Sequence, residues 1–162
     1  YPTPKNATEA LLQRQSFIGK IWEPACGNGA MSCVMEKEGY EVYSTDLIDR
    51  GYGQSGIDFL METQRFDNIV TNPPFTLALE FTLKALELAN KKVVMLSKMS
   101  YLEGIKRRKL LFNQKKLEKV LVFSQRIPFK KADSEEKANG LMAFGWFIYD
   151  VNYDGLPTID WI

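Results

Sequence analysis

Two consecutive prolines, Pro73 and Pro74, follow a short apolar run at residues 68–70. Such a run predicts a buried strand. Proline has no backbone N–H to donate and its ring fixes φ, so a Pro-Pro pair ends the strand ladder and stiffens the bend that follows. We therefore expect a buried strand that stops at Thr71 and a rigid corner at residues 72–75.

This proline corner (residues 72–75) combines hydrogen-bond acceptors with an aromatic ring. The side-chain oxygen of Asn72 and the carbonyl of Pro73 can each accept one hydrogen of an NH2 group, while Phe75 can stack on the ring that bears it. An isolated Pro-Pro-Phe sequence more often ends a strand and adds a ring to the core. A second loop upstream favours the functional interpretation.

That second loop, the glycine loop (residues 24–29), belongs to the sequence KIWEPACGNG at residues 20–29. Ile21 and Trp22 predict a strand, and Gly27 and Gly29 follow it where a helix should begin. Glycine lets a backbone approach a ligand closely, and a helix N-terminus favours a carboxylate. A dinucleotide-binding loop would need a third glycine at the position of Ser32, so the GxGxxG pattern is broken.

Strand-like and helix-like segments alternate along the whole chain, which predicts an α/β fold with a mostly parallel sheet. We expect Asn6 or Thr8 to cap the first helix. The expected strands are residues 21–22, 40–45, 56–60, 68–71, 92–97, 120–123 and 141–149, and the expected helices are residues 4–15, the segment after Gly29, 76–90 and 105–114.

Length and composition fit one domain over residues 1–162. The hydrophobic fraction is 45% and the charged fraction 25%, which are ordinary values for a globular protein. No stretch reaches the length of a membrane span and no signal-peptide pattern is present, so we expect a cytoplasmic protein with no membrane partner.

Histidine is absent, and the two cysteines, Cys26 and Cys33, lie within one predicted loop-helix unit. Neither a disulfide framework nor a metal site is expected. The usual proton shuttle is missing as well, so the chemistry has to proceed without it. We expect Cys26 to pack in the loop and Cys33 to be a small core residue of the helix.

The sequence Glu-Pro-Ala-Cys-Gly-Asn-Gly at residues 23–29 and Asn-Pro-Pro-Phe at residues 72–75 together resemble the S-adenosylmethionine-dependent amino methyltransferases of the DNA adenine type. The resemblance covers most of the chain. It implies a Rossmann-like class I methyltransferase fold, with helices on both faces of a seven-stranded, mostly parallel sheet in the order 3-2-1-4-5-7-6 and an antiparallel last strand. Tyr1-Pro2-Thr3-Pro4 precedes both motifs, which is the linear order of the gamma group.

The resemblance implies that S-adenosylmethionine is the methyl donor. Asp46 would bind the ribose hydroxyls and Leu47 would flank the adenine ring, while Asp58 would accept from the adenine amino group and Phe59 would lie against the ring. Alternatively, Asp46 is an exposed turn residue and Thr3 belongs to a frayed end. The implied donor-binding residues are Thr3, Glu23, Pro24, Ala25, Cys26, Gly27, Gly29, Asp46, Leu47, Asp58, Phe59 and Asn72.

The resemblance also implies a direct transfer of the methyl group to an exocyclic amine, with position contributing more than acid-base chemistry. Asn72 and Pro73 would accept the amino hydrogens, and Pro74 would stiffen the corner. A base inside a duplex must be flipped out to reach such a corner. Phe129 would supply a second aromatic wall beside Phe75, unless it is a core residue.

A basic segment follows the proline corner. Residues 98–137 contain twelve basic and five acidic side chains, a net charge of +7, so the remainder of the chain carries −6. The segment is either a solvated surface or a contact for a nucleic-acid backbone. Lys98 and Arg126 are the expected phosphate contacts.

The expected function is methylation of the 6-amino group of adenine in DNA. Methylation at cytosine carbon five is excluded because no cysteine accompanies the proline corner. The alternatives are an RNA adenine or cytosine 4-amino methyltransferase, a protein glutamine methyltransferase, and an inactive donor- or nucleic-acid-binding subunit. Because 162 residues leave little room for a separate target-recognition domain, either residues 98–137 or a partner subunit would supply recognition.

Overall fold

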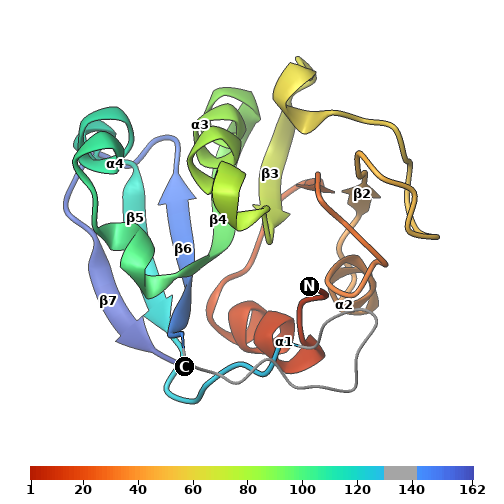
Figure 1. The fold of residues 1–162 in the computed structure, drawn as a ribbon, viewed down its shortest axis with the longest axis horizontal. Helices are drawn as coiled ribbons and strands as arrows, with labels where there is room; N and C mark the ends of the chain where they lie inside the picture. The colour runs from red at the N-terminus through yellow and green to blue at the C-terminus, as the bar shows by residue number, and fades with distance from the viewer. Residues whose placement is uncertain (130–141) are drawn as a thin grey trace.

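The structure is a computed structural model that describes residues 1–129 and 142–162. Its described residues form one seven-stranded sheet in the order β2-β1-β3-β4-β6-β5-β7 (Figure 1). The strands are β1 (Ile21–Glu23), β2 (Val42–Ser44), β3 (Phe66–Thr71), β4 (Ala89–Lys98), β5 (Leu117–Val122), β6 (Phe144–Asp150) and β7 (Thr158–Trp161). The helices are α1 (Lys5–Arg14), α2 (Ser32–Lys37), α3 (Ala78–Leu88) and α4 (Ile105–Leu110), with 3-10 turns η1 (Phe59–Met61), η2 (Phe75–Leu77), η3 (Met99–Leu102) and η4 (Phe112–Gln114).

The sheet is mostly parallel, as expected. Only β6 runs against its neighbours β4 and β5, whereas the other adjacent pairs are parallel. The chain leaves β1 toward β2 and then returns to β3 on the other side of β1. The reversal in strand order therefore lies between β1 and β3, where open α/β sheets bind ligands outside the carboxyl ends of the strands.

Successive side chains of a strand point to opposite faces of the sheet. In the central strands the side chains on both faces are buried. Ile69, Val93 and Met95 belong to a core under α3, and Val70 and Leu96 belong to a second core under α1 and α2. Such continuous apolar runs are typical of strands covered by helices on both sides. The expectation of helices on both faces is confirmed.

The expected third strand, at residues 56–60, is wrong. Asp58 caps the 3-10 turn η1 by accepting from the backbone N–H of Leu60 at 3.0 Å. Instead, a single parallel bridge between Thr45 and Gln54 extends the sheet beside β2. Gly51, Gly53 and Gly56 all have positive φ, so the backbone around them is not extended.

The seventh strand is β7, which the sequence analysis did not predict. It pairs in parallel with β5 at the sheet edge, and its side chains are mostly exposed, so it lacks the burial pattern of an inner strand. Since β7 follows the antiparallel strand β6, the antiparallel strand is the last but one in the chain. The strand expected at residues 141–149 corresponds to β6, and its expected first residue lies outside the described residues.

The first helix begins without a side-chain cap. Pro4 occupies the N-cap position and neither Asn6 nor Thr8 caps it. Pro4 contributes its carbonyl, which accepts from the N–H of Ala7. Among the described residues, no helix has both the length and the apolarity needed to cross a membrane.

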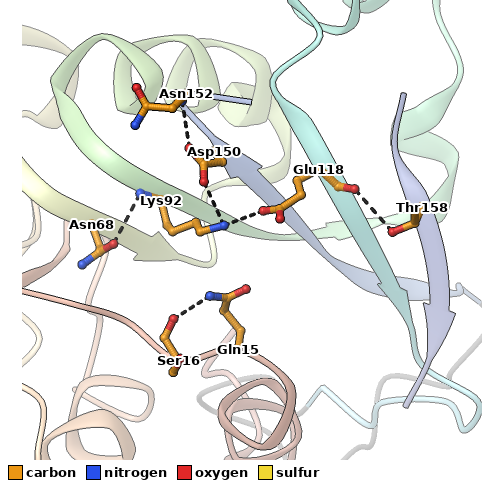
Figure 2. A network of polar contacts seen from close by, with 8 residues as sticks. All are labelled: Gln15, Ser16, Asn68, Lys92, Glu118, Asp150, Asn152 and Thr158. Atoms are coloured by element: carbon orange, nitrogen blue, oxygen red, sulfur yellow. Dashed lines mark hydrogen bonds and ion pairs between the residues drawn. The ribbon is translucent and has the colours of Figure 1, made fainter. Parts of the chain in front are cut away.

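An ion cluster joins β4, β5 and the antiparallel strand β6 between them, at the end of the sheet where β4 begins (Figure 2). Lys92 Nζ lies 2.5 Å from Glu118 Oε2 and 3.0 Å from Asp150 Oδ2. Burial alone would lower the pKa of Lys92, but its bonds to both carboxylates outweigh this and raise the pKa. Burial would raise the pKa of Asp150, but the backbone N–H of Asn152 and Lys92 together hold it below its ordinary value.

We predict that Lys92→Met lowers the free energy of unfolding by about 1–2 kcal/mol, because two half-buried carboxylates lose their cation. The lysine contribution is lost as pH rises through its raised pKa, and the aspartate contribution is lost as pH falls through its lowered pKa. The difference from wild type should therefore be largest between about pH 5 and pH 9 in urea denaturation. Lys20→Met, which removes an exposed pair with Glu41, is the matched control and should cost less than about 0.5 kcal/mol.

Candidate active site

The glycine loop and the proline corner lie at the same edge of the sheet. The glycine loop follows β1, the proline corner follows β3, and these strands are adjacent and parallel, with Ile21 opposite Asn68 and Trp22 opposite Ile69. Because parallel strands place their carboxyl ends together, two motifs about fifty residues apart in sequence become neighbours. The strand order therefore places the predicted donor and acceptor elements side by side.

The glycine loop needs its glycines. Gly27 has φ of 56° and Gly29 has φ of 80°, which side chains rarely adopt. The backbone N–H of Gly27 donates to Asp46 Oδ2 at 2.9 Å. A Cβ at Gly27 would meet only Arg50 Cδ, at 4.0 Å, so this face of the loop is open.

Glu23 ends β1 with a buried carboxylate. Ser32 Oγ donates to Glu23 Oε2 and lies 2.6 Å from Ser44 Oγ, so a chain of three polar groups connects β1, the start of α2 and β2. Desolvation by burial raises the pKa of Glu23 to about 8. The side chain thus supports the loop from below, and contact with a donor stays a prediction.

Asp46 lies where the sequence predicts a ribose-binding carboxylate. Its two oxygens accept from the backbone N–H of Gly27 at 2.9 Å and of Ile48 at 3.0 Å. These bonds orient the carboxylate while each oxygen retains capacity for another donor. Leu47 beside it is exposed, as a residue flanking a bound ring would be in the free protein.

Asp58 and Phe59 are placed differently from each other. Asp58 is exposed, with one oxygen capping η1. Phe59 is 2% exposed, and its ring packs against Trp22 and Phe81 with centroids 5.1 and 5.0 Å away. The Phe59 ring is therefore a core ring with almost no surface for a ligand.

Cys26 and Cys33 differ in burial. Cys26 is buried in the glycine loop, and its thiol approaches the carbonyl of Tyr52 at 3.6 Å, so the expectation of loop packing is confirmed. Burial raises the pKa of Cys26 to about 12, so it stays a thiol. The expectation that Cys33 is a core residue is wrong, because this side chain of α2 is exposed.

The other residues of the glycine loop differ in burial as well. Pro24 is buried, and Ala25 is half-buried against the core under α3.

Thr3 and Asn72 meet across the site although 69 residues separate them. Asn72 Nδ2 donates to Thr3 Oγ1 at 3.1 Å. Thr3 is 6% exposed, so this part of the N-terminal segment is packed rather than frayed. Asn72 Oδ1 is one of five buried side-chain oxygens that have no hydrogen-bond partner among the described residues, whereas most buried polar atoms in proteins are paired.

Three aromatic rings form a group at the proline corner. Phe75 is 38% exposed, and its centroid lies 5.7 Å from that of Phe144, which lies 4.6 Å from that of Phe129. Lys98 Nζ lies 4.6 Å from the centre of the Phe75 ring. The structure thus groups three predicted substrate residues, Phe75, Phe129 and Lys98, around Phe144.

Phe144 was missed by the sequence analysis. It starts β6 opposite Lys98 of β4. An antiparallel strand presents its amino end where its neighbours present their carboxyl ends, so the first aromatic residue of the expected last strand was the available signal.

The basic residues are divided between two regions. Arg126 is exposed and follows β5 on the carboxyl side of the sheet, near the buried Phe129. The basic helix α4 lies far from the end of β3 that carries the proline corner (Figure 1). Within α4, Arg107 is already bound to the carbonyl of Glu103 and covers the ring of Tyr101 at 5.0 Å.

No protein-family model matches this sequence, and no curated protein matches it either. Solved structures match in fold. A protein of Pyrococcus horikoshii provisionally assigned as an RNA methyltransferase has a TM-score of 0.69 at 20% identity, over 93% of this chain and 86% of its own. The chain has the class I methyltransferase fold.

Two longer proteins show the same fold. One is the modification subunit of a provisionally assigned type I restriction enzyme from Vibrio vulnificus, with a TM-score of 0.65 at 14% identity over the whole of this chain. The other is a provisionally assigned class I S-adenosylmethionine-dependent methyltransferase from Listeria monocytogenes, with a TM-score of 0.65 at 13% identity over 98% of this chain. The chain spans 46% of the Vibrio protein and 62% of the Listeria protein.

We predict that Glu23→Gln removes a pH dependence of stability. In the unfolded chain this carboxyl ionises near its ordinary pKa, whereas in the folded protein it holds its proton to about pH 8. The folded state therefore binds more protons over this interval, and the free energy of unfolding should fall as pH rises from about 4.5 to 8, by at most about 1.4 kcal/mol per pH unit.

Urea denaturation at several pH values measures this slope. Glu23→Gln should flatten it and be more stable than wild type at pH 8, whereas the exposed control Glu41→Gln should retain it. A wild-type profile without a decline over this interval would contradict the prediction.

Proposed function

We propose that this chain transfers a methyl group from S-adenosylmethionine to an exocyclic amino group of a nucleic-acid base, with the 6-amino group of adenine in DNA as the acceptor. The observation that carries the proposal is the proline corner. Asn72 is held by Thr3 with its side-chain oxygen buried and unpaired, on the strand next to the glycine loop. An acceptor without a donor among the described residues is what an NH2 group would satisfy once the side chain is uncovered for it.

The residues around the glycine loop suit S-adenosylmethionine. Gly27 leaves an open face beside the oriented carboxylate of Asp46, and the apolar Leu47 is exposed next to it. Asp46 would hold the ribose hydroxyls and Leu47 would flank the adenine ring, while Gly27 and Gly29 would admit the methionine part. When bound, the donor supplies an electrophilic methyl group on a sulfonium.

The proline corner would position the acceptor. Asn72 Oδ1 and the Pro73 carbonyl would accept the two amino hydrogens, which orients the nitrogen lone pair and stabilises the positive charge that develops during transfer. The ring of Phe75, backed by Phe144, would stack on the base. Holding both reactants in line accounts for catalysis without a histidine.

A duplex base would have to leave the stack to reach this corner. Flipping costs a few kcal/mol, which stacking on Phe75 and hydrogen bonds to Asn72 would offset. Phe129 contacts Phe144 and would extend the aromatic wall. Lys98 and Arg126 would contact the backbone of the flipped strand.

An adenine or cytosine amine in RNA is the second candidate, because the fold is shared with the Pyrococcus protein assigned to RNA. The similarity to the Vibrio modification subunit supports DNA, and in that case a partner subunit would contribute target recognition. Incubation with tritiated donor and separate DNA, RNA and protein acceptors, followed by nucleoside analysis, distinguishes these candidates. Labelled glutamine in a protein acceptor, or no label in any acceptor, would overturn the proposal.

We predict that Asn72→Ala lowers the transfer rate at least about a hundredfold, because the amine loses an oriented acceptor. The affinity for S-adenosylhomocysteine should change little in titration calorimetry, since the other proposed donor contacts remain. The exposed Asn113 gives the control Asn113→Ala, which should leave both quantities unchanged. Equal loss of transfer and donor binding would contradict the division of roles between loop and corner.

We predict that Lys98→Gln with Arg126→Gln weakens nucleic-acid binding and lowers the slope of log affinity against log salt by about 2, one unit for each lost phosphate contact. The matched control is Lys106→Gln with Lys109→Gln in α4, which removes the same charge far from the corner (Figure 1). Fluorescence anisotropy with a labelled oligonucleotide at several salt concentrations measures both. A larger effect in the control would place the nucleic acid over α4 instead.

A further inference from the structure

A covering segment (residues 45–54), which follows β2 in the chain, lies along the glycine loop. The N–H of Cys26 donates to the carbonyl of Thr45 at 3.0 Å, and the N–H of Gly27 donates to Asp46 at 2.9 Å. The Cys26 thiol approaches the carbonyl of Tyr52 at 3.6 Å. Two consecutive residues of the loop are thus bonded to the covering segment.

The Tyr52 ring packs against the glycine loop as well. A Cβ built on Gly29 would lie 2.5 Å from Cγ of Tyr52 and 2.6 Å from both of its Cδ atoms, so the ring rests directly on the Gly29 backbone. Real Cβ atoms do not approach that closely, so only a glycine fits under this ring at position 29. The ring in turn covers a glycine whose φ is 80°.

The Tyr52 side chain is anchored at its far end as well. Its hydroxyl donates to both carboxylate oxygens of Glu36 in α2, at 3.1 Å each. Burial, together with the adjacent Cys33 and Glu36, raises the pKa of Tyr52, so the hydroxyl keeps the proton that it donates. The ring therefore connects the glycine loop to the helix that follows it.

Gly53 fixes the position of Tyr52. A Cβ at Gly53 would lie 2.6 Å from the carbonyl oxygen of Ser44 and 2.9 Å from the Cys26 sulfur. This close approach brings the covering segment against both β2 and the glycine loop. Gly29 and Gly53 thus allow the two segments to pack on each other.

From this geometry we propose that Tyr52 is a positioning residue for donor binding, whose ring holds Gly29 and the glycine loop in the conformation that receives the methyl donor. The inference rests on the proposed function, because it assigns the donor to this loop. Tyr52 acts through the glycine loop and not by touching the reacting atoms. Its loss should loosen the loop and weaken donor binding while the sheet stays folded.

Titration calorimetry with S-adenosylhomocysteine tests this inference. Tyr52→Ala should raise the dissociation constant about tenfold, as expected when a supporting side chain of a binding loop is removed. Tyr52→Phe retains the ring on Gly29 and should restore most of the affinity. Tyr52→Leu fills part of the same space and keeps the test valid if the alanine variant does not fold.

The matched control is Tyr153→Ala. Tyr153 is also half-buried and also lies against a glycine, since a Cβ at Gly155 would lie 3.0 Å from its hydroxyl oxygen, but it precedes β7, the edge strand at the end of the sheet order opposite to β2. This variant should bind the probe like wild type. Thermal melting of each variant separates a loss of folding from a loss of binding.

A double-mutant cycle gives the sharpest result. Gly29→Ala should weaken binding, in part because the new Cβ meets the Tyr52 ring, so the same change should cost less in a Tyr52→Ala background. Additive effects, or a Tyr52→Ala affinity within twofold of wild type, would overturn the inference. Absence of binding by the wild-type protein would instead refute the proposed donor, and the inference with it.

Discussion

The parallel pairing of β1 with β2 on one side and β3 on the other is the constraint on which the candidate site depends. It brings the ends of three strands to one edge of the sheet, and those ends carry the glycine loop, Asp46 and the proline corner. No single segment contains the site. A change that shifted β1 by one residue would separate Asp46 from Gly27 and turn every side chain of the strand to the opposite face.

The sequence was sufficient to predict the parts of the fold where local chemistry and tertiary context agree. The apolar run before Pro73 is β3, and the glycines after Trp22 do form a loop before a helix. The expected strand at residues 56–60 does not form because the positive φ of Gly56 and the turn that Asp58 caps are incompatible with an extended backbone. β7 was missed since an edge strand with exposed side chains has no burial periodicity to detect.

The candidate site divides in the same way. Motif residues such as Thr3 and Asn72 could be named from the sequence. Their hydrogen bond could not be predicted from it, because the bond depends on the packing of α1 and β3. Phe144 and Tyr52 carried no motif, and their roles emerge only from the rings and glycines that they contact. Phe59 was assigned to a ligand, yet a ring between Trp22 and Phe81 serves the core.

Two polar groups of the site are buried, and the free-energy cost of burial is met differently in each. Glu23 is desolvated, and the proton that it retains reduces the free-energy cost of its burial. Its hydrogen bond with Ser32 satisfies the side chain, so Glu23 can support the glycine loop in the free protein. Asn72 Oδ1 is neutral and has no partner within residues 1–129 and 142–162, so the cost of its burial persists in the free protein; in the proposed reaction, the amino group of the acceptor would remove that cost. If the proposed role of Asn72 holds, an acceptor left unpaired in this way would favour an NH2 group over a group without hydrogens to donate, because only the former would remove the cost. Selectivity for an amine would then follow from the free protein's own unmet hydrogen bond, before any contact with the rest of the substrate.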